Sequence, residues 1–121
     1  MDLDQGKWLQ KYNLTKNSKI IDVRTPQEFQ EFRIPDSENI DFYDPQNFIK
    51  KITLLDKDTS YFLYCKSGVR SYNSCTIMKD MGFKNVYNLV GGISDWNGEV
   101  LKWDKFLYYY YQFFYVRVLN N

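Results

Sequence analysis

Short apolar runs between polar residues mark the predicted strands of this chain. The runs at 60–64 and 86–90 are rich in branched or aromatic side chains, which is typical of buried strands. The continuous run at 20–23 favours a central strand of a parallel sheet. A shorter run at 39–41 predicts one more strand.

The segments between these strands predict helices. Thr25 is placed to cap a helix that has Pro26 as its first residue, and Glu28 completes a capping box. Phe29 and Phe32 are three residues apart and share a helix face, which predicts that both belong to the core. The predicted helices are 4–11, Thr25 to the Ile34-Pro35 step, 46–55, 70–81 and 93–96. Strands that alternate with helices predict an α/β fold with a mainly parallel central sheet flanked by helices.

The most informative stretch joins the predicted strand at 60–64 to the predicted helix at 70–81. Its cysteine follows the carboxyl end of the strand, where parallel sheets place their sites. The first N–H groups of a helix have no partner within it, so they point into the loop and favour negative charge there. The loop residues are Cys65, Lys66, Ser67, Gly68, Val69 and Arg70.

Each part of this loop favours a cysteine thiolate, which is the nucleophilic form of the side chain. Gly68 can adopt a positive φ, so backbone N–H groups can turn inward as an anion cradle. Lys66 and Arg70 add two cations. We therefore expect Cys65 to be a nucleophile. Cys75, on the following helix, is expected to pack inward as a small buried hydrophobe.

The composition narrows the chemistry by exclusion. The chain has no histidine and two cysteines, which excludes Ser-His-Asp and Cys-His catalysis and any zinc site that needs histidine or four cysteines. A nucleophilic Cys65 must then be activated by loop amides and cations. The net charge of +1 gives no reason to expect a nucleic acid partner, and 121 residues suit one domain.

Beyond the loop, an ordered set of segments resembles the rhodanese family of sulfurtransferases and covers roughly residues 18 to 100. The resemblance implies a rhodanese-like three-layer α/β fold. Two departures lie outside the cysteine loop, Arg33 where the family often has histidine and Asp36-Ser37 where it often has Gly-Ala. The matching segments are Ile20-Ile21-Asp22-Val23-Arg24, Glu28-Phe29, Ile34-Pro35, Asn39-Ile40, the cysteine loop with Ser71, Met81-Gly82-Phe83, and Val86 to Ile93 with Trp96.

The resemblance implies sulfur transfer by double displacement through a persulfide on Cys65, without a cofactor or metal. The thiolate would attack the outer sulfur of a small anionic donor, thiosulfate being the simplest, and an acceptor thiol or cyanide would then remove that sulfur. The loop amides would stabilise the persulfide, and the two cations would hold the sulfonate oxygens of the donor. The expected substrate-binding residues are Lys66, Ser67, Gly68, Val69 and Arg70.

Four of the charged residues also have structural interpretations, and for Lys66 this is a solvated lysine at the surface. Arg70 could instead pair with an acid and brace the loop. Asp22 and Arg24 match a family segment at the rim of the active site, and a structural ion pair between them is the alternative interpretation.

Other functions stay open on the residues alone. A sulfur carrier, loaded by a protein of a sulfur relay, would use the same persulfide, whereas a partner-binding or regulatory module would need none. A Cys-based phosphatase or arsenate reductase shares the thiolate, the amide cradle and the arginine. Those enzymes, however, place one residue more between cysteine and arginine than the four found here.

The segment 104–121 is an aromatic tail that follows the predicted single domain at 1–103 and matches no part of the family. Its apolar run at 106–119 is shorter than the about 20 residues that span a bilayer. We expect an extra helix or strand packed on the domain. The alternatives are that the segment contacts a membrane, that it forms a dimer contact, or that it is not the natural end of the coding region. The first residues form no secretory signal and the cysteines no disulfide framework, so a cytoplasmic location is expected.

Overall fold

A computed structural model describes residues 1–102 and residue 113. The predicted tail at 104–121 lies outside the described residues except at position 113, so the expected helix or strand there stays a prediction. Across the described residues, no helix is long and apolar enough to cross a membrane.

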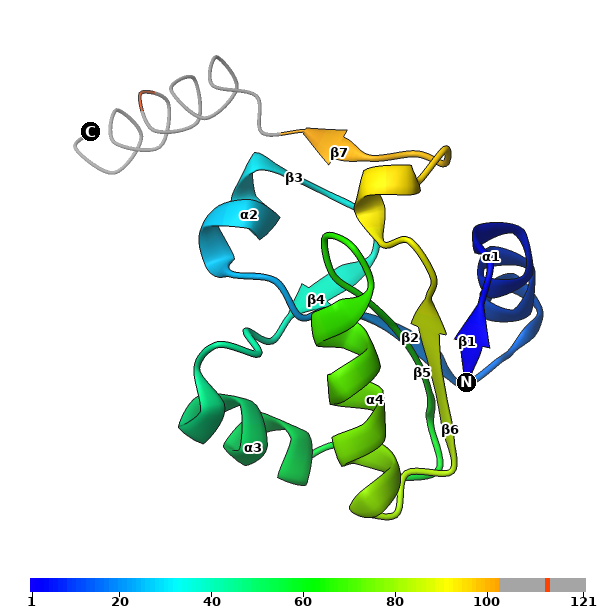
Figure 1. Cartoon of the computed structure of the whole chain (residues 1–121), viewed down its shortest axis with the longest axis vertical. Coiled ribbons are helices and arrows are strands. Elements are labelled where there is room, and N and C mark those ends of the chain that lie inside the picture. Colours follow the sequence, from blue (N-terminus) through cyan, green and yellow to red (C-terminus); the bar gives the residue numbers. More distant parts are fainter. Residues whose placement is uncertain (103–112, 114–121) are drawn as a thin grey trace.

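The centre of the molecule is a five-stranded parallel sheet (Figure 1). In spatial order it consists of β1 (Asp2–Leu3), β6 (Asn85–Leu89), β5 (Ser60–Tyr64), β2 (Ser18–Asp22) and β4 (Ser37–Asn39). Since all neighbouring pairs are parallel, the carboxyl ends of the strands meet at one edge. A small antiparallel sheet pairs β3 (Phe32–Arg33) with β7 (Leu101–Lys102).

Helices cover both faces of the central sheet and its carboxyl edge (Figure 1). They are α1 (Gln5–Leu14), α2 (Pro26–Glu31), α3 (Pro45–Thr53), α4 (Val69–Asp80) and the 3₁₀ helix η1 (Ile93–Asp95). The predicted capping box is confirmed, because the Thr25 hydroxyl accepts a hydrogen bond from the Glu28 N–H and the Glu28 carboxylate accepts one from the Thr25 N–H.

Two hydrophobic clusters, one on each face of the sheet, make up the core. Leu63 of β5 belongs to the cluster beneath α3 and α4, while its neighbour Phe62 belongs to the cluster beneath α1. Successive side chains of a strand point to opposite faces, so the fully buried β5 serves both clusters. The α/β prediction with three layers and a mainly parallel sheet is therefore confirmed.

Several local predictions need correction. Phe32 is not a core residue: α2 ends at Glu31, and Phe32 lies in β3 with 38% of its surface exposed. Phe29 is half-buried. The strand predicted at 39–41 lies two residues earlier, and β1, β3 and β7 were not predicted, because segments of two residues carry no periodic pattern.

Candidate functional site

Cys65 lies directly after the central strand β5, and its Sγ accepts three hydrogen bonds from the chain that follows. The donors are the Gly68 N–H at 3.1 Å, the Ser71 N–H at 3.4 Å and the Ser71 hydroxyl at 3.3 Å. Only 1% of the Cys65 surface is exposed. Such an arrangement of donors stabilises negative charge on sulfur. Ser71 belongs to the resembling segments, but the sequence did not indicate that its hydroxyl would reach Sγ.

The cradle forms because of the backbone conformation of Gly68. This residue precedes α4 with φ of 102°, a left-handed conformation that glycine adopts without steric cost. No side chain caps the helix at this position, so its first N–H groups remain available to the loop. The predicted inward turn of backbone N–H groups is therefore present.

The turn after β6 fixes the other side of the cysteine loop. The Ile93 N–H donates to the Cys65 carbonyl at 2.9 Å, and the Ser94 N–H donates to the Lys66 carbonyl at 3.0 Å. Gly92 makes this approach possible, since a Cβ there would collide with the Lys66 carbonyl. Two loops far apart in the sequence thus hold each other in place.

Asn88 connects the cysteine loop to the first strand. Its side-chain amide donates to the Gly68 carbonyl at 3.2 Å and to the Asp2 carboxylate at 3.0 Å. The first contact holds the carbonyl of Gly68, the residue whose N–H donates to Sγ. Nothing in the sequence pattern of Asn88 indicates this role.

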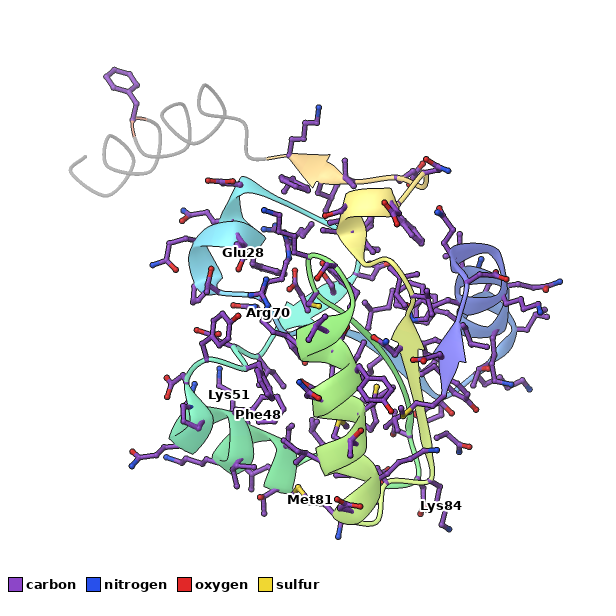
Figure 2. All side chains as sticks on the ribbon, in the orientation of Figure 1. Glu28, Phe48, Lys51, Arg70, Met81 and Lys84 are labelled. Atoms are coloured by element: carbon purple, nitrogen blue, oxygen red, sulfur yellow. The ribbon has the colours of Figure 1, made fainter. Side chains whose placement is uncertain are left out.

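Arg70 pairs with an acid. Its guanidinium donates to both carboxylate oxygens of Glu28, at 2.8 and 3.1 Å, and lies over the Tyr43 ring at 4.9 Å. Figure 2 shows Glu28 and Arg70 on neighbouring elements, α2 and the start of α4. The hydrogen bonds from Arg70 are the largest cause that lowers the pKa of Glu28 to about 2. The structure thus contains the pairing with an acid that the interpretation of Arg70 as a brace requires.

Asp22 and Arg24 form the ion pair that was the structural alternative for these residues. The Arg24 Nη2 donates to the Asp22 carboxylate at 2.7 Å and to the Phe32 carbonyl at 2.7 Å. Both side chains are buried. Their charges are therefore committed to each other and to the β3 backbone.

The remaining loop residues are exposed. Ser67 and Val69 line a cavity of about 280 Å³ together with Tyr72. Lys66 lines a separate cavity of about 190 Å³ that includes Glu28, Glu31 and Phe32 of the neighbouring α2 and β3. The loop thus has an open space on each side.

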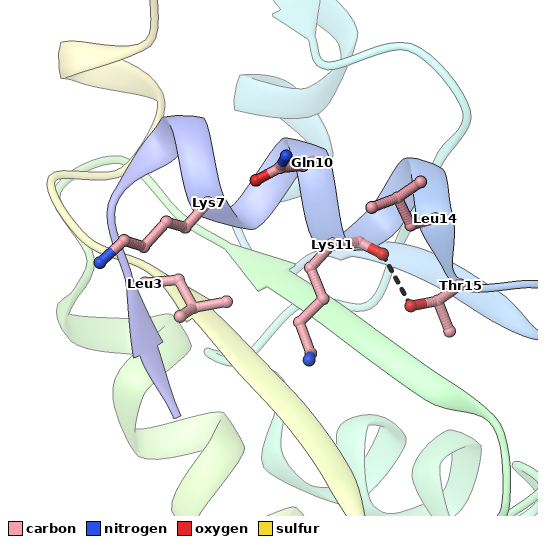
Figure 3. Close-up of a pocket in the computed structure, with 6 residues that line it drawn as sticks. All are labelled: Leu3, Lys7, Gln10, Lys11, Leu14 and Thr15. Carbon is pink, nitrogen blue, oxygen red and sulfur yellow. Dashed lines mark hydrogen bonds between the residues drawn. The ribbon is translucent and has the colours of Figure 1, made fainter.

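A larger cavity lies away from this loop. It measures about 420 Å³ and is formed by α1 and the edge strand β1, with Lys7, Lys11 and Leu14 among its lining residues (Figure 3). No residue of the cysteine loop lines it. Cavity size alone therefore does not point to the cysteine loop.

Cys75 packs inward on α4, as predicted. It is completely buried in the cluster beneath α3 and α4, and burial raises the pKa of its thiol to about 12. Cys65 and Cys75 are both free thiols. Both cysteines belong to this buried cluster, but three hydrogen-bond donors reach the Sγ of Cys65, whereas none of the described residues donates to the thiol of Cys75.

Known proteins with similar sequences include several connected with sulfur transfer. A sulfurtransferase of Allochromatium vinosum is 32% identical over 96 residues, which cover 78% of this chain and 86% of that protein. YtwF of Bacillus subtilis, a candidate sulfurtransferase, is 41% identical over 80 residues, covering 66% and 74%. YrkF of the same organism, a candidate sulfur carrier protein, is 32% identical over 90 residues, covering 74% and 47%.

The fold and the family model agree with these similarities. A rhodanese-related protein from Thermoplasma volcanium superimposes with a TM-score of 0.70 at 23% identity, covering 83% of this chain and 96% of that one. The model of the Rhodanese-like domain matches residues 6–99. The chain therefore belongs to the rhodanese-like family of sulfurtransferases.

Proposed function

We propose that this protein transfers sulfane sulfur from thiosulfate or a similar anionic donor to a thiol or cyanide, through a persulfide on Cys65. In the first step the Cys65 thiolate forms a bond to the outer sulfur of thiosulfate. The sulfur–sulfur bond of the donor breaks, and sulfite leaves with the electron pair. In the second step the acceptor takes the outer sulfur and the Cys65 thiolate is regenerated.

The observation that carries this proposal is the set of three hydrogen bonds to Sγ. Gly68 and Ser71 direct their donors at a single sulfur atom. Fixed donors of this kind stabilise the Cys65 thiolate that attacks the donor in the first step and that leaves in the second step, when the acceptor takes the outer sulfur. Cys75 belongs to the same buried cluster as Cys65, but none of the described residues donates a hydrogen bond to its thiol.

We assign the two loop cations different roles. The Lys66 ammonium makes no hydrogen bond or ion pair within the described part of the chain, so it is available to the sulfonate oxygens of a donor. Arg70 is committed to Glu28 and braces the loop. Ser67, Gly68 and Val69 contribute backbone and shape to the same loop, and the Asp22–Arg24 pair supports its rim.

Steady-state turnover tests the proposal. Wild-type protein with thiosulfate and cyanide should release thiocyanate, and Cys65→Ser should reduce release to the uncatalysed rate while the circular dichroism spectrum stays unchanged. Thiocyanate formation by Cys65→Ser at the wild-type rate would reject Cys65 as the nucleophile.

A sulfur carrier is the second candidate function, and the similarity to YrkF favours it. A carrier would receive sulfur from a protein donor, such as a cysteine desulfurase, and deliver it to another protein of a sulfur relay. It would form the same persulfide but would not turn over free thiosulfate. We propose a reducing compartment, the cytoplasm, for either function, because both need Cys65 as a free thiol.

A further inference from the structure

The cavity beside Lys66 contains two unpaired charges of opposite sign. Of its charged lining residues, Arg24 is held by Asp22 and Glu28 is held by Arg70. The side chains of Lys66 and Glu31 make no ion pair or hydrogen bond with other described residues. The cavity therefore offers one free cation and one free carboxylate.

The cavity is also attached to the reactive loop. Ser94, which lines it, donates its N–H to the Lys66 carbonyl, and the neighbouring Ile93 donates to the Cys65 carbonyl. Its volume of about 190 Å³ lies below the range of about 300–1,000 Å³ that is typical for pockets of drug-sized ligands. A single amino acid suits this space better than a peptide.

We propose, on the basis of the sulfur transfer proposed above, that this cavity selects a small zwitterionic thiol as the sulfur acceptor. Lys66 binds the carboxylate of such a thiol, and Glu31 binds its ammonium group. Cysteine itself has this chemistry. A thiol that lacks either charge leaves one of the two side chains without a partner.

Double displacement allows Lys66 to serve both substrates. The sulfonate of the donor has left as sulfite before the acceptor binds, so the ammonium is free again for a carboxylate. The acceptor sulfur then forms a bond to the outer sulfur of the Cys65 persulfide. The old sulfur–sulfur bond breaks, its electron pair returns to Cys65, and the proton of the acceptor thiol ends on the new persulfide.

The test compares four acceptors on protein that thiosulfate has loaded with sulfur. The acceptors are cysteine, cysteamine, which lacks the carboxylate, 3-mercaptopropionate, which lacks the ammonium group, and cyanide. The rate of each variant is divided by the wild-type rate with the same acceptor, so that differences in thiol reactivity cancel. Glu31→Gln should lower kcat/KM for cysteine and cysteamine roughly fivefold and leave the other two unchanged.

Asp80→Asn is the matched control, because Asp80 is also an exposed acid at the last position of a helix and makes no ion pair among the described residues. The Asp80→Asn variant should have the wild-type kcat/KM with all four acceptors. An equal effect of Glu31→Gln on all acceptors, or no effect on any, would overturn the acceptor assignment alone. Failure of thiosulfate to add sulfur to the wild-type protein would instead reject the proposed function and this inference with it.

Discussion

At the scale of single residues, the proposed reactivity of Cys65 depends on the groups that donate hydrogen bonds to its sulfur. The Gly68 and Ser71 N–H groups belong to the backbone and persist in most variants. The Ser71 hydroxyl is the donor that a substitution can remove without moving the chain. It therefore gives the most selective test of the cradle.

Ser71→Ala should reduce kcat/KM for sulfur transfer about tenfold, since one hydrogen bond to a charged atom is lost. Thiocyanate release measures this effect. Ser74→Ala is the control. Ser74 lies three residues after Ser71 on α4 and is equally buried, but its hydroxyl donates to the Arg70 carbonyl instead. Equal activity losses in both variants would contradict a direct role of the Ser71 hydroxyl.

Cys75→Ser should retain most of the activity, because Cys75 is buried in the core and is not needed as a second thiol. The variant should lose about 1–2 kcal/mol of stability, since a hydroxyl replaces a thiol in apolar surroundings. Thiocyanate release and urea unfolding measure the two effects. Loss of activity in a folded variant would show that Cys75 takes part in the reaction.

At the scale of elements, the site is built where α2 meets the start of α4. The capping box of α2 was predictable, because Thr25 and Glu28 are three residues apart. The pairing of Glu28 with Arg70 was not, because 42 residues separate them and no local pattern encodes the contact. The cysteine loop could likewise be predicted, because its residues are consecutive in the sequence. The contacts of Ser71 with Sγ and of Asn88 with Gly68 could not be predicted, because no local pattern encodes them.

The Glu28–Arg70 pair should make stability depend on pH. The pKa of Glu28 falls from 4.5 to about 2 on folding, so its contribution is complete above pH 4.5 and is lost as the pH falls toward 2. Because 28% of the Glu28 side chain is exposed to solvent, which screens the charges, we expect the pair to contribute only about 1 kcal/mol to the free energy of unfolding.

Glu28→Gln keeps a capping residue at this position and removes the charge. Its unfolding free energy should therefore be lower than that of the wild type at pH 7, and the difference should disappear near pH 2. Glu31→Gln, on the same helix without an ion pair among the described residues, should show no such pH dependence. A difference for Glu28→Gln that persists at pH 2 would argue against this account of the pair.

At the scale of the whole molecule, the residues of the candidate site lie together at the carboxyl edge of the parallel sheet. The loop after β5 carries Cys65, and the turn after β6 supplies Gly92 and Ile93, which contact it from the next strand. The predicted order of strands and helices already implied this edge. Only the structure reveals how closely the two loops approach.

Gly92→Ala should destabilise the protein by about 3 kcal/mol, because it adds strain at φ of 62° and a collision with the Lys66 carbonyl. Gly82→Ala is the control. Gly82 also has a positive φ, 98°, but a Cβ there would meet only the flexible Lys57 side chain, so about 1 kcal/mol is expected. Equal losses in urea unfolding would show that the contact between the loops contributes little.

The mass of the intact protein after brief exposure to thiosulfate, without reductant, tests the central claim most directly. We predict that the wild type gains one sulfur atom, that cyanide removes it, and that Cys65→Ser gains none. A wild type that stays unmodified by thiosulfate, or a Cys65→Ser variant that gains the sulfur, would contradict the account.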